Sequence, residues 1–259
     1  MMGALWSAAS GMRAQQLNID VTSNNLANVN STGFKRARAE FQDLMYRTVR
    51  DSGSPQSGTS IPSSVQIGMG VGPSAIARIF TQGDFVQTEN PMDLVIEGEG
   101  FFQVTRPDGT TAYTRDGAFK KDANGQILTG EGLLLSPNVS VPPNATKVVV
   151  GTDGVVSAEV NGNLTNVGQI QLARFSNPAG LNSIGHNLFA ATPASGDPIT
   201  GAPQSEGFGN IVQGYLENSN VKVVEEMVNL IIAQRAYEAN SKSIQSADEM
   251  LGQANNLKR

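Results

Sequence analysis

Histidine is the side chain that most often performs acid–base chemistry near neutral pH, and this sequence contains a single one, His186. In a serine hydrolase, this histidine would have to lie beside the nucleophilic serine that it activates. The local sequence Ser183-Ile184-Gly185-His186-Asn187 has no Gly-x-Ser-x-Gly motif. A histidine in a turn between two strands is the simpler interpretation, so we predict no catalytic role for His186.

Paired carboxylates could serve as the acid and base of a glycosidase, and Asp93, Glu97 and Glu99 are the candidates. Glu97 and Glu99 are two positions apart, so on a strand they would project from the same face. The sequence indicates no opposing wall of a cleft. We therefore predict that the protein is not an enzyme. A wall-associated β-domain hydrolase or binding module remains the alternative from another functional class.

The sequence lacks the residue patterns of metal sites, reactive thiols and cofactor-binding sites. The chain has no cysteine, which excludes disulfides, thiolate metal sites and cysteine nucleophiles. Asp122-x-Asn124-Gly125 is similar to the start of a calcium loop but lacks the later ligands, so a β-turn is expected. Gly98-x-Gly100 is not followed by a helix that could receive a phosphate. No cofactor and no metal site are predicted.

The charge balance limits the partners that the protein can bind. Lys and Arg total 18 against 23 for Asp and Glu, and a net charge of -5 predicts no nucleic-acid partner. The short basic cluster Lys35, Arg36 and Arg38 is typical of a solvated face.

No apolar run approaches the roughly 18 residues that cross a bilayer, so no direct membrane insertion is expected. The N-terminal residues also lack the basic region of a cleavable signal, which by itself would indicate a cytoplasmic protein.

The N-terminal residues have the seven-residue repeat of a coiled-coil helix. The repeating positions are Leu5, Met12, Ile19 and Leu26. The pattern predicts a helix over about 3–29, which ends before Gly33 because glycine readily adopts the left-handed capping conformation.

A second column of seven-residue spacing marks the C-terminal end. Its members are Val223, Leu230, Tyr237, Ile244 and Leu251. The predicted helix, about 221–255, would span on the order of 50 Å, which is long for a globular domain. For the first helix, backbone ordering costs about 1 to 2 kcal/mol per residue. Each of its half-dozen apolar side chains returns about 1.5 to 3 kcal/mol when buried, so that helix does not hold itself together alone. We interpret both columns as assembly interfaces. A self-contained helical hairpin capping a β domain is the alternative.

Between the helices, the sequence is typical of antiparallel β structure. Five dipeptides there suit the positive φ angles of tight turns: Asp108-Gly109, Asp116-Gly117, Asn124-Gly125, Asp153-Gly154 and Asn161-Gly162. The intervening pieces 101–105 and 147–150 alternate as strands do. The predicted fold class is α+β. Residues 1–33 and 216–259 would form a coiled-coil-like terminal domain, 34–69 a linker with a Ser/Gly-rich inserted loop, and 70–215 a mostly antiparallel β domain.

Four ordered motifs run along the chain. They comprise Asn25, Leu26, Ala27, Asn28, Gly33 and Phe34; then Asn90, Pro91, Asp93, Gly98, Gly100, Phe101 and Phe102; then 113–117; and finally Arg235 and Tyr237 within 234–242. In this order and over nearly the whole chain, they resemble the motifs of the bacterial flagellar axial proteins, the family of rod and hook subunits. The likeness is strongest to subunits of the distal rod.

This resemblance implies a structural subunit that self-assembles into a straight, rigid, hollow helical tube and transmits motor torque to the hook across the periplasm. Both terminal helices would form the inner tube, and the segment 46–66 is similar to the inserted stretch of distal rods. The implied partners are further copies of the chain, the proximal rod proteins, the hook protein, the outer-membrane and peptidoglycan ring proteins and the flagellar export apparatus. The implied location is the flagellar basal body, reached without a cleaved signal peptide. A proximal-rod or hook subunit is the alternative within the family.

Overall fold

The computed structural model describes residues 2–50 and 64–256. The chain forms two compact units, each assembled from separate stretches of sequence. The helical unit contains 1–27, 37–77 and 222–259, and the β unit contains 28–36 and 78–221. Terminal helices and a central antiparallel β region confirm the predicted α+β class. Among the described residues, no helix is long and apolar enough to cross a membrane.

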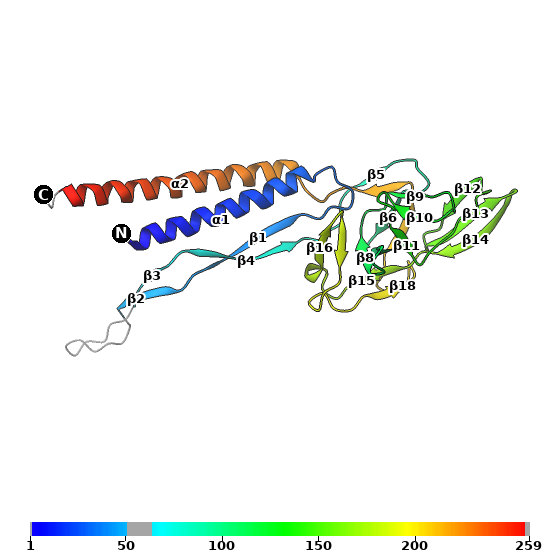
Figure 1. Ribbon diagram of the computed structural model, residues 1–259, viewed down its shortest axis with the longest axis horizontal. Helices are drawn as coiled ribbons and strands as arrows, with labels where there is room; N and C mark the ends of the chain where they lie inside the picture. The colour runs from blue at the N-terminus through cyan, green and yellow to red at the C-terminus, as the bar shows by residue number, and fades with distance from the viewer. Residues whose placement is uncertain (1, 51–63, 257–259) are drawn as a thin grey trace. The chain divides into compact units, whose positions relative to one another are not determined.

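Two long helices, α1 (Met2–Ala27) and α2 (Val223–Asn256), lie side by side in the helical unit (Figure 1). Their bounds lie within two residues of the helices predicted from the seven-residue spacing. On α2 the buried positions Glu226, Ala233 and Ala247 fall on one heptad column. Two of these three side chains are alanines, and small side chains allow two helix backbones to approach closely.

A two-stranded arm completes the helical unit. Strand β1 (Ala37–Asp43) pairs with β4 (Val71–Arg78), and β2 (Tyr46–Arg50) pairs antiparallel with β3 (Val65–Gly68). The prediction of a linker over 34–69 is therefore wrong for the described residues of that segment. Their strands depend on pairing across a distance in sequence and on contact of β1 with α1, which local composition does not reveal. Residues 51–63 of the predicted inserted loop lie outside the described residues.

The β unit consists of four sheets. The largest has the strand order β16-β17-β8-β7-β11-β10-β9, with β15 joining β7 to β18. The strands of this sheet are β7 (Phe101–Thr105), β8 (Thr111–Thr114), β9 (Phe119–Lys121), β10 (Ile127–Thr129), β11 (Leu134–Ser136), β15 (Leu172–Arg174), β16 (Asn182–Gly185), β17 (Leu188–Ala190) and β18 (Ile199–Gly201). Every pairing with a printed register is antiparallel, as predicted.

Three smaller sheets complete the unit. The strands β12 (Lys147–Val150), β13 (Val155–Val160) and β14 (Asn163–Gln169) form one of them, in that order. The two pairs are β5 (Phe85–Gln87) with β20 (Tyr215–Glu217), and β6 (Leu94–Glu97) with β19 (Asn210–Gln213). A short 3₁₀ helix, η1 (Pro178–Gly180), lies before β16.

Adjacent phenylalanines on β7 anchor two separate cores of the β unit. Phe102 belongs to the larger core and packs edge-to-face on Phe119, with ring centroids 5.1 Å apart. Phe101 belongs to a second core with Tyr113 and Phe175. Successive side chains of a strand point to opposite faces, so one Phe-Phe pair serves both cores.

Four of the five predicted turn dipeptides have the expected positive φ at glycine, and Asn161-Gly162 has it at both residues, between β13 and β14. Gly117 is the exception, because its φ is not positive. A Cβ atom at Gly117 would lie 1.6 Å from the Leu94 carbonyl oxygen. Glycine is required at this position by close approach of two backbones, and not by turn conformation.

Candidate assembly surface

The two predicted heptad columns border the contact between α1 and α2. On α1, Leu5, Met12, Ile19 and Leu26 are all half-buried. On α2, Leu230 and Ile244 are half-buried, whereas Val223, Tyr237 and Leu251 are exposed. A single chain thus leaves apolar surface of both columns in contact with solvent. Their role as assembly interfaces remains a prediction.

A second exposed set of apolar side chains lies on the first turns of α2, which sequence reasoning missed. This apolar stripe consists of Val224, Met227, Val228, Ile231 and Ile232, which are 49 to 74% exposed. Positions 224, 228 and 231 follow the i, i+4, i+7 spacing of one helix face. That face lies opposite the buried column that contains Glu226 and Ala233. The i, i+4, i+7 spacing of the stripe can be read from the sequence. The stripe residues do not belong to the strict seven-residue column from which the helix was predicted, and so they were not identified.

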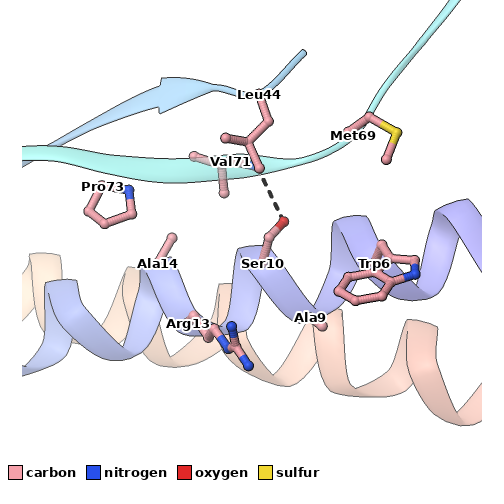
Figure 2. A pocket seen from close by; sticks show the side chains of 9 residues that line it. All are labelled: Trp6, Ala9, Ser10, Arg13, Ala14, Leu44, Met69, Val71 and Pro73. Atoms are coloured by element: carbon pink, nitrogen blue, oxygen red, sulfur yellow. Dashed lines mark hydrogen bonds between the residues drawn. The ribbon is translucent and has the colours of Figure 1, made fainter. Parts of the chain in front are cut away.

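An apolar groove of about 470 Å³ lies between α1 and the arm (Figure 2). Its lining residues are Trp6, Ala9, Ser10, Arg13, Ala14, Leu44, Met69, Val71 and Pro73. The Val71 amide donates to Ser10 Oγ at 3.2 Å, and the Ser10 hydroxyl donates to the Ser7 carbonyl at 2.9 Å. Trp6, Leu44 and Met69 are exposed, so the groove offers large apolar side chains to solvent.

Asn25, from the first motif, joins all three parts of the helical unit. Its side-chain amide donates to the Ala37 carbonyl at 2.8 Å and to Glu226 Oε2 at 3.2 Å. Its Oδ1 accepts the Ala37 amide at 2.9 Å. Asn25 is buried, so these bonds satisfy groups that water cannot reach. The motif residue therefore fixes α1, β1 and α2 together.

A buried ion-pair network within the β unit holds Lys35, which follows Phe34 of the first motif. Lys35 Nζ lies 2.5 Å from Glu217 Oε1, and Arg115 Nη1 lies 3.5 Å from Glu217 Oε2. Lys35 also donates to the Thr81 carbonyl at 2.8 Å. Desolvation lowers the pKa of Lys35 although the charge of Glu217 acts in the opposite direction. The prediction that this basic cluster forms a solvated face is wrong for Lys35, because its side chain is 0% exposed.

Glycines of the first two motifs permit close approaches in the β unit. Gly33 has φ of 66°, and a Cβ there would lie 2.6 Å from the Asp116 amide nitrogen. Gly98 has φ of 109° and approaches the backbone of Gly209. Close approach of neighbouring backbone accounts for the glycine at each of these positions.

The Asn90–Asp93 segment of the second motif forms a turn closed by its own side chains. Asn90 Nδ2 donates to Asp93 Oδ1 at 2.9 Å, and the Met92 amide donates to Asn90 Oδ1 at 3.2 Å.

In the fourth motif, exposed Arg235 pairs with Glu238 on α2 at 3.1 Å. These contacts are those of a turn and a surface ion pair, and they do not indicate a catalytic site.

Of the candidate catalytic residues, His186 lines a small hollow of about 150 Å³ together with Asp116, Glu131 and Asn187. His186 and Asn187 form the turn between β16 and β17, which confirms the prediction of a turn histidine. Nδ1 of the His186 imidazole contacts the carboxylate of Glu131 at the surface. Glu97 and Glu99 are both exposed. Among the described residues, no group of three or more acidic or histidine side chains could hold a metal.

The sequence matches three families over separate segments. These are the flagella basal body rod protein family at residues 5–35, the flagellar hook protein FlgE/F/G D1 domain at 95–158, and the flagellar basal body rod FlgEFG protein C-terminal family at 212–257. The first and last segments cover most of α1 and α2, and the middle segment begins in β6.

Full-length relatives are more specific. The flagellar basal-body rod protein FlgG of Borreliella burgdorferi is 50% identical, with all of both chains covered. FlgG of Caulobacter vibrioides is 49% identical over 99% of this chain and all of that protein. The flagellar hook protein FlgE of Helicobacter mustelae is 43% identical, but over only 52% of this chain and 30% of that protein. The chain therefore belongs to the FlgG family of flagellar basal-body rod proteins.

Proposed function

We propose that this protein is the structural subunit of the flagellar distal rod and that its copies assemble into a straight, hollow helical tube. The full-length likeness to FlgG proteins carries this proposal. It favours the distal rod over the hook, because the hook-protein relative covers about half of this chain. The same likeness supports a structural role and no enzymatic one.

The terminal helices supply the surfaces for assembly in this proposal. Apolar side chains that stay exposed in a single chain are costly in water, at about 25 cal/mol per Å² of apolar area. The exposed members of the α2 column and the apolar stripe together give α2 apolar surface on more than one side. A subunit surrounded by copies in a helical lattice can bury several faces of one helix at once.

Partners and location follow from a place in the distal rod. The proximal rod proteins would contact one end of the tube and the hook protein the other. The outer-membrane and peptidoglycan rings would surround it in the periplasm, and the export apparatus would deliver each subunit without cleavage of a signal peptide. Such a tube would carry motor torque to the hook.

Electron microscopy of the purified full chain tests the proposal. We expect straight hollow rods at high protein concentration, and their loss on Val228→Asp, which places a charge in the apolar stripe. Leu164→Asp is the matched control, since Leu164 is exposed on β14 in the β unit. A chain that stays monomeric under all assembly conditions, or that cleaves purified cell wall, would contradict a rod subunit.

A further inference from the structure

The apolar groove and the apolar stripe belong to the same helical unit but cannot meet within one chain. The groove lies between α1 and the arm, whereas the stripe lies on the face of α2 that points away from the buried column. We propose that the groove of one copy receives the apolar stripe of a second copy. This inference rests on the proposed function and identifies which surfaces join neighbouring subunits.

Symmetry favours this pairing. A contact in which both copies use the same patch closes into a dimer and cannot extend. An open helical polymer needs at least one contact that joins two different patches, head to tail. A groove on one element and a convex stripe on another are such a pair, and both are formed within a single helical unit.

The chemistry of the two surfaces is complementary. Seven of the nine groove residues are apolar, and the hydroxyl of Ser10 is already bonded to Val71 and Ser7. An aliphatic stripe can therefore enter without leaving a polar group unsatisfied. Arg13 is the charged residue of the lining, and it is exposed. Exposed Glu225 follows Val224 at the border of the stripe, and its carboxylate lies 3.4 Å from Lys222 Nζ, so the charges beside the stripe are paired with each other.

The shape of the groove also suits a helix. Figure 2 shows Ser10 and Ala14 of α1 directed toward Leu44, Val71 and Pro73 of the arm, whereas Ala9 and Arg13 project from another side of α1. The lining residues of α1 run from Trp6 to Ala14, so the hollow follows the direction of this helix. Ala9, Ser10 and Ala14 contribute small side chains to the lining, and Trp6, Leu44 and Met69 contribute large ones. Side chains of the stripe, one turn apart, could enter such an elongated hollow in succession.

Disulfide trapping tests this contact, because the chain has no cysteine and each introduced thiol is unique. Ala9→Cys places a thiol in the groove and Ile231→Cys places one in the stripe. The two variants are mixed, assembled and mildly oxidised. We expect covalent dimers in the mixture and several-fold fewer from either variant alone. Trapping requires Cβ atoms roughly 3.5 to 4.5 Å apart, so only a direct contact gives a high yield.

Ala9→Cys mixed with Leu164→Cys is the control for random collision, since Leu164 is exposed but lies in the β unit. Equal yields from both mixtures would overturn the inference. So would rods that assemble normally but give no dimers, and in that case the proposed rod function would stand. If the wild-type chain forms no rods at all, the proposed function fails and the docking contact fails with it.

A charge substitution provides a second measurement that does not depend on oxidation. Ile231→Asp would bury a carboxylate in the groove, so we expect at least a tenfold higher critical concentration for assembly. Ile231→Leu should assemble as wild type does. Circular dichroism checks that both variants keep their helices, which is expected because Ile231 is 54% exposed. Assembly of Ile231→Asp at the wild-type concentration would overturn the inference.

Discussion

Lys35 Nζ and Glu217 Oε1 are 2.5 Å apart, and both side chains are almost fully buried. This pair joins two stretches of the β unit that are 182 positions apart in sequence. Glu217 Oε1 also accepts the Gly83 amide at 2.9 Å, and Arg115 approaches the other oxygen of the carboxylate. One buried carboxylate thus interacts with two buried cations.

Replacing this carboxylate should be costly. Glu217→Gln keeps the shape of the side chain but removes the counter-charge of Lys35 and the stronger of the two carboxylate interactions of Arg115. We expect the free energy of unfolding of the β unit to fall by about 3 to 5 kcal/mol. Urea denaturation measures it. Glu238→Gln, which removes the exposed pair with Arg235, should cost less than about 1 kcal/mol. Equal effects of the two substitutions would contradict the structural role of the network.

Asp116 should make stability depend on pH. Burial raises the pKa of Asp116 above its ordinary value of 3.8, and the charges of Asp93 and Glu131 raise it further, although hydrogen bonds from Ala118 and Thr32 oppose this. The folded state then holds this proton more tightly than the unfolded state. The stabilisation is complete below pH 3.8 and is lost as pH rises through the folded pKa.

Asp116→Asn isolates this contribution, because the amide oxygen can still accept from Thr32 Oγ1 and the Ala118 amide. We expect the variant to gain stability relative to wild type as pH rises above 3.8, with no gain below it. Thermal unfolding at a series of pH values measures the difference. A difference that is constant over the whole range would show that the charge of Asp116 is not responsible.

Asn25→Ala should weaken the helical unit. The substitution removes the partner of the Ala37 amide and carbonyl and one partner of Glu226. An unsatisfied buried polar group costs about 1 to 3 kcal/mol, and we expect a total loss within about 2 to 4 kcal/mol. Helix circular dichroism during denaturation follows this unit. Asn30→Ala, at an exposed position, is the control and should change stability little.

Gly117→Ala should prevent normal packing of the β unit. The added methyl would lie 1.6 Å from a carbonyl oxygen of the backbone, and no flexible side chain can move to relieve this clash. We expect a loss above about 4 kcal/mol, and little soluble protein. Gly130→Ala is the matched control, since its Cβ would meet no atom within 4 Å. Wild-type stability of Gly117→Ala would show that this approach of two backbones is not as close as the structure describes.

Sequence periodicity located both helices, because it depends on neighbouring residues alone. It did not identify which face of α2 is buried, since the buried column includes a carboxylate, Glu226, besides Ala233 and Ala247. The residue that pairs with Glu226, Asn25, is 201 positions away in sequence. Hydrophobic patterns cannot reveal a seam built from small and polar side chains.

The same limit applies to the β unit and the arm. The strand at Phe101–Thr105 has Phe, Val and Thr residues typical of strands and was predicted with correct bounds. Lys35 was placed on a solvated face, because its counter-ion Glu217 lies far along the chain. The arm was predicted to be a linker, because its strands pair over long separations and carry many exposed residues. The groove could not be predicted, since it requires α1 and the arm to be placed together.

The two units are interleaved along the chain, and this affects the time at which each can fold. The β unit is complete once residue 221 is available, whichever stretches precede it. The helical unit draws on both 1–27 and 222–259, and most of the β unit lies between these two stretches. During synthesis, α1 therefore cannot pack on α2 until the residues of the β unit have been made. The helical unit can form only after the whole β unit is available for folding.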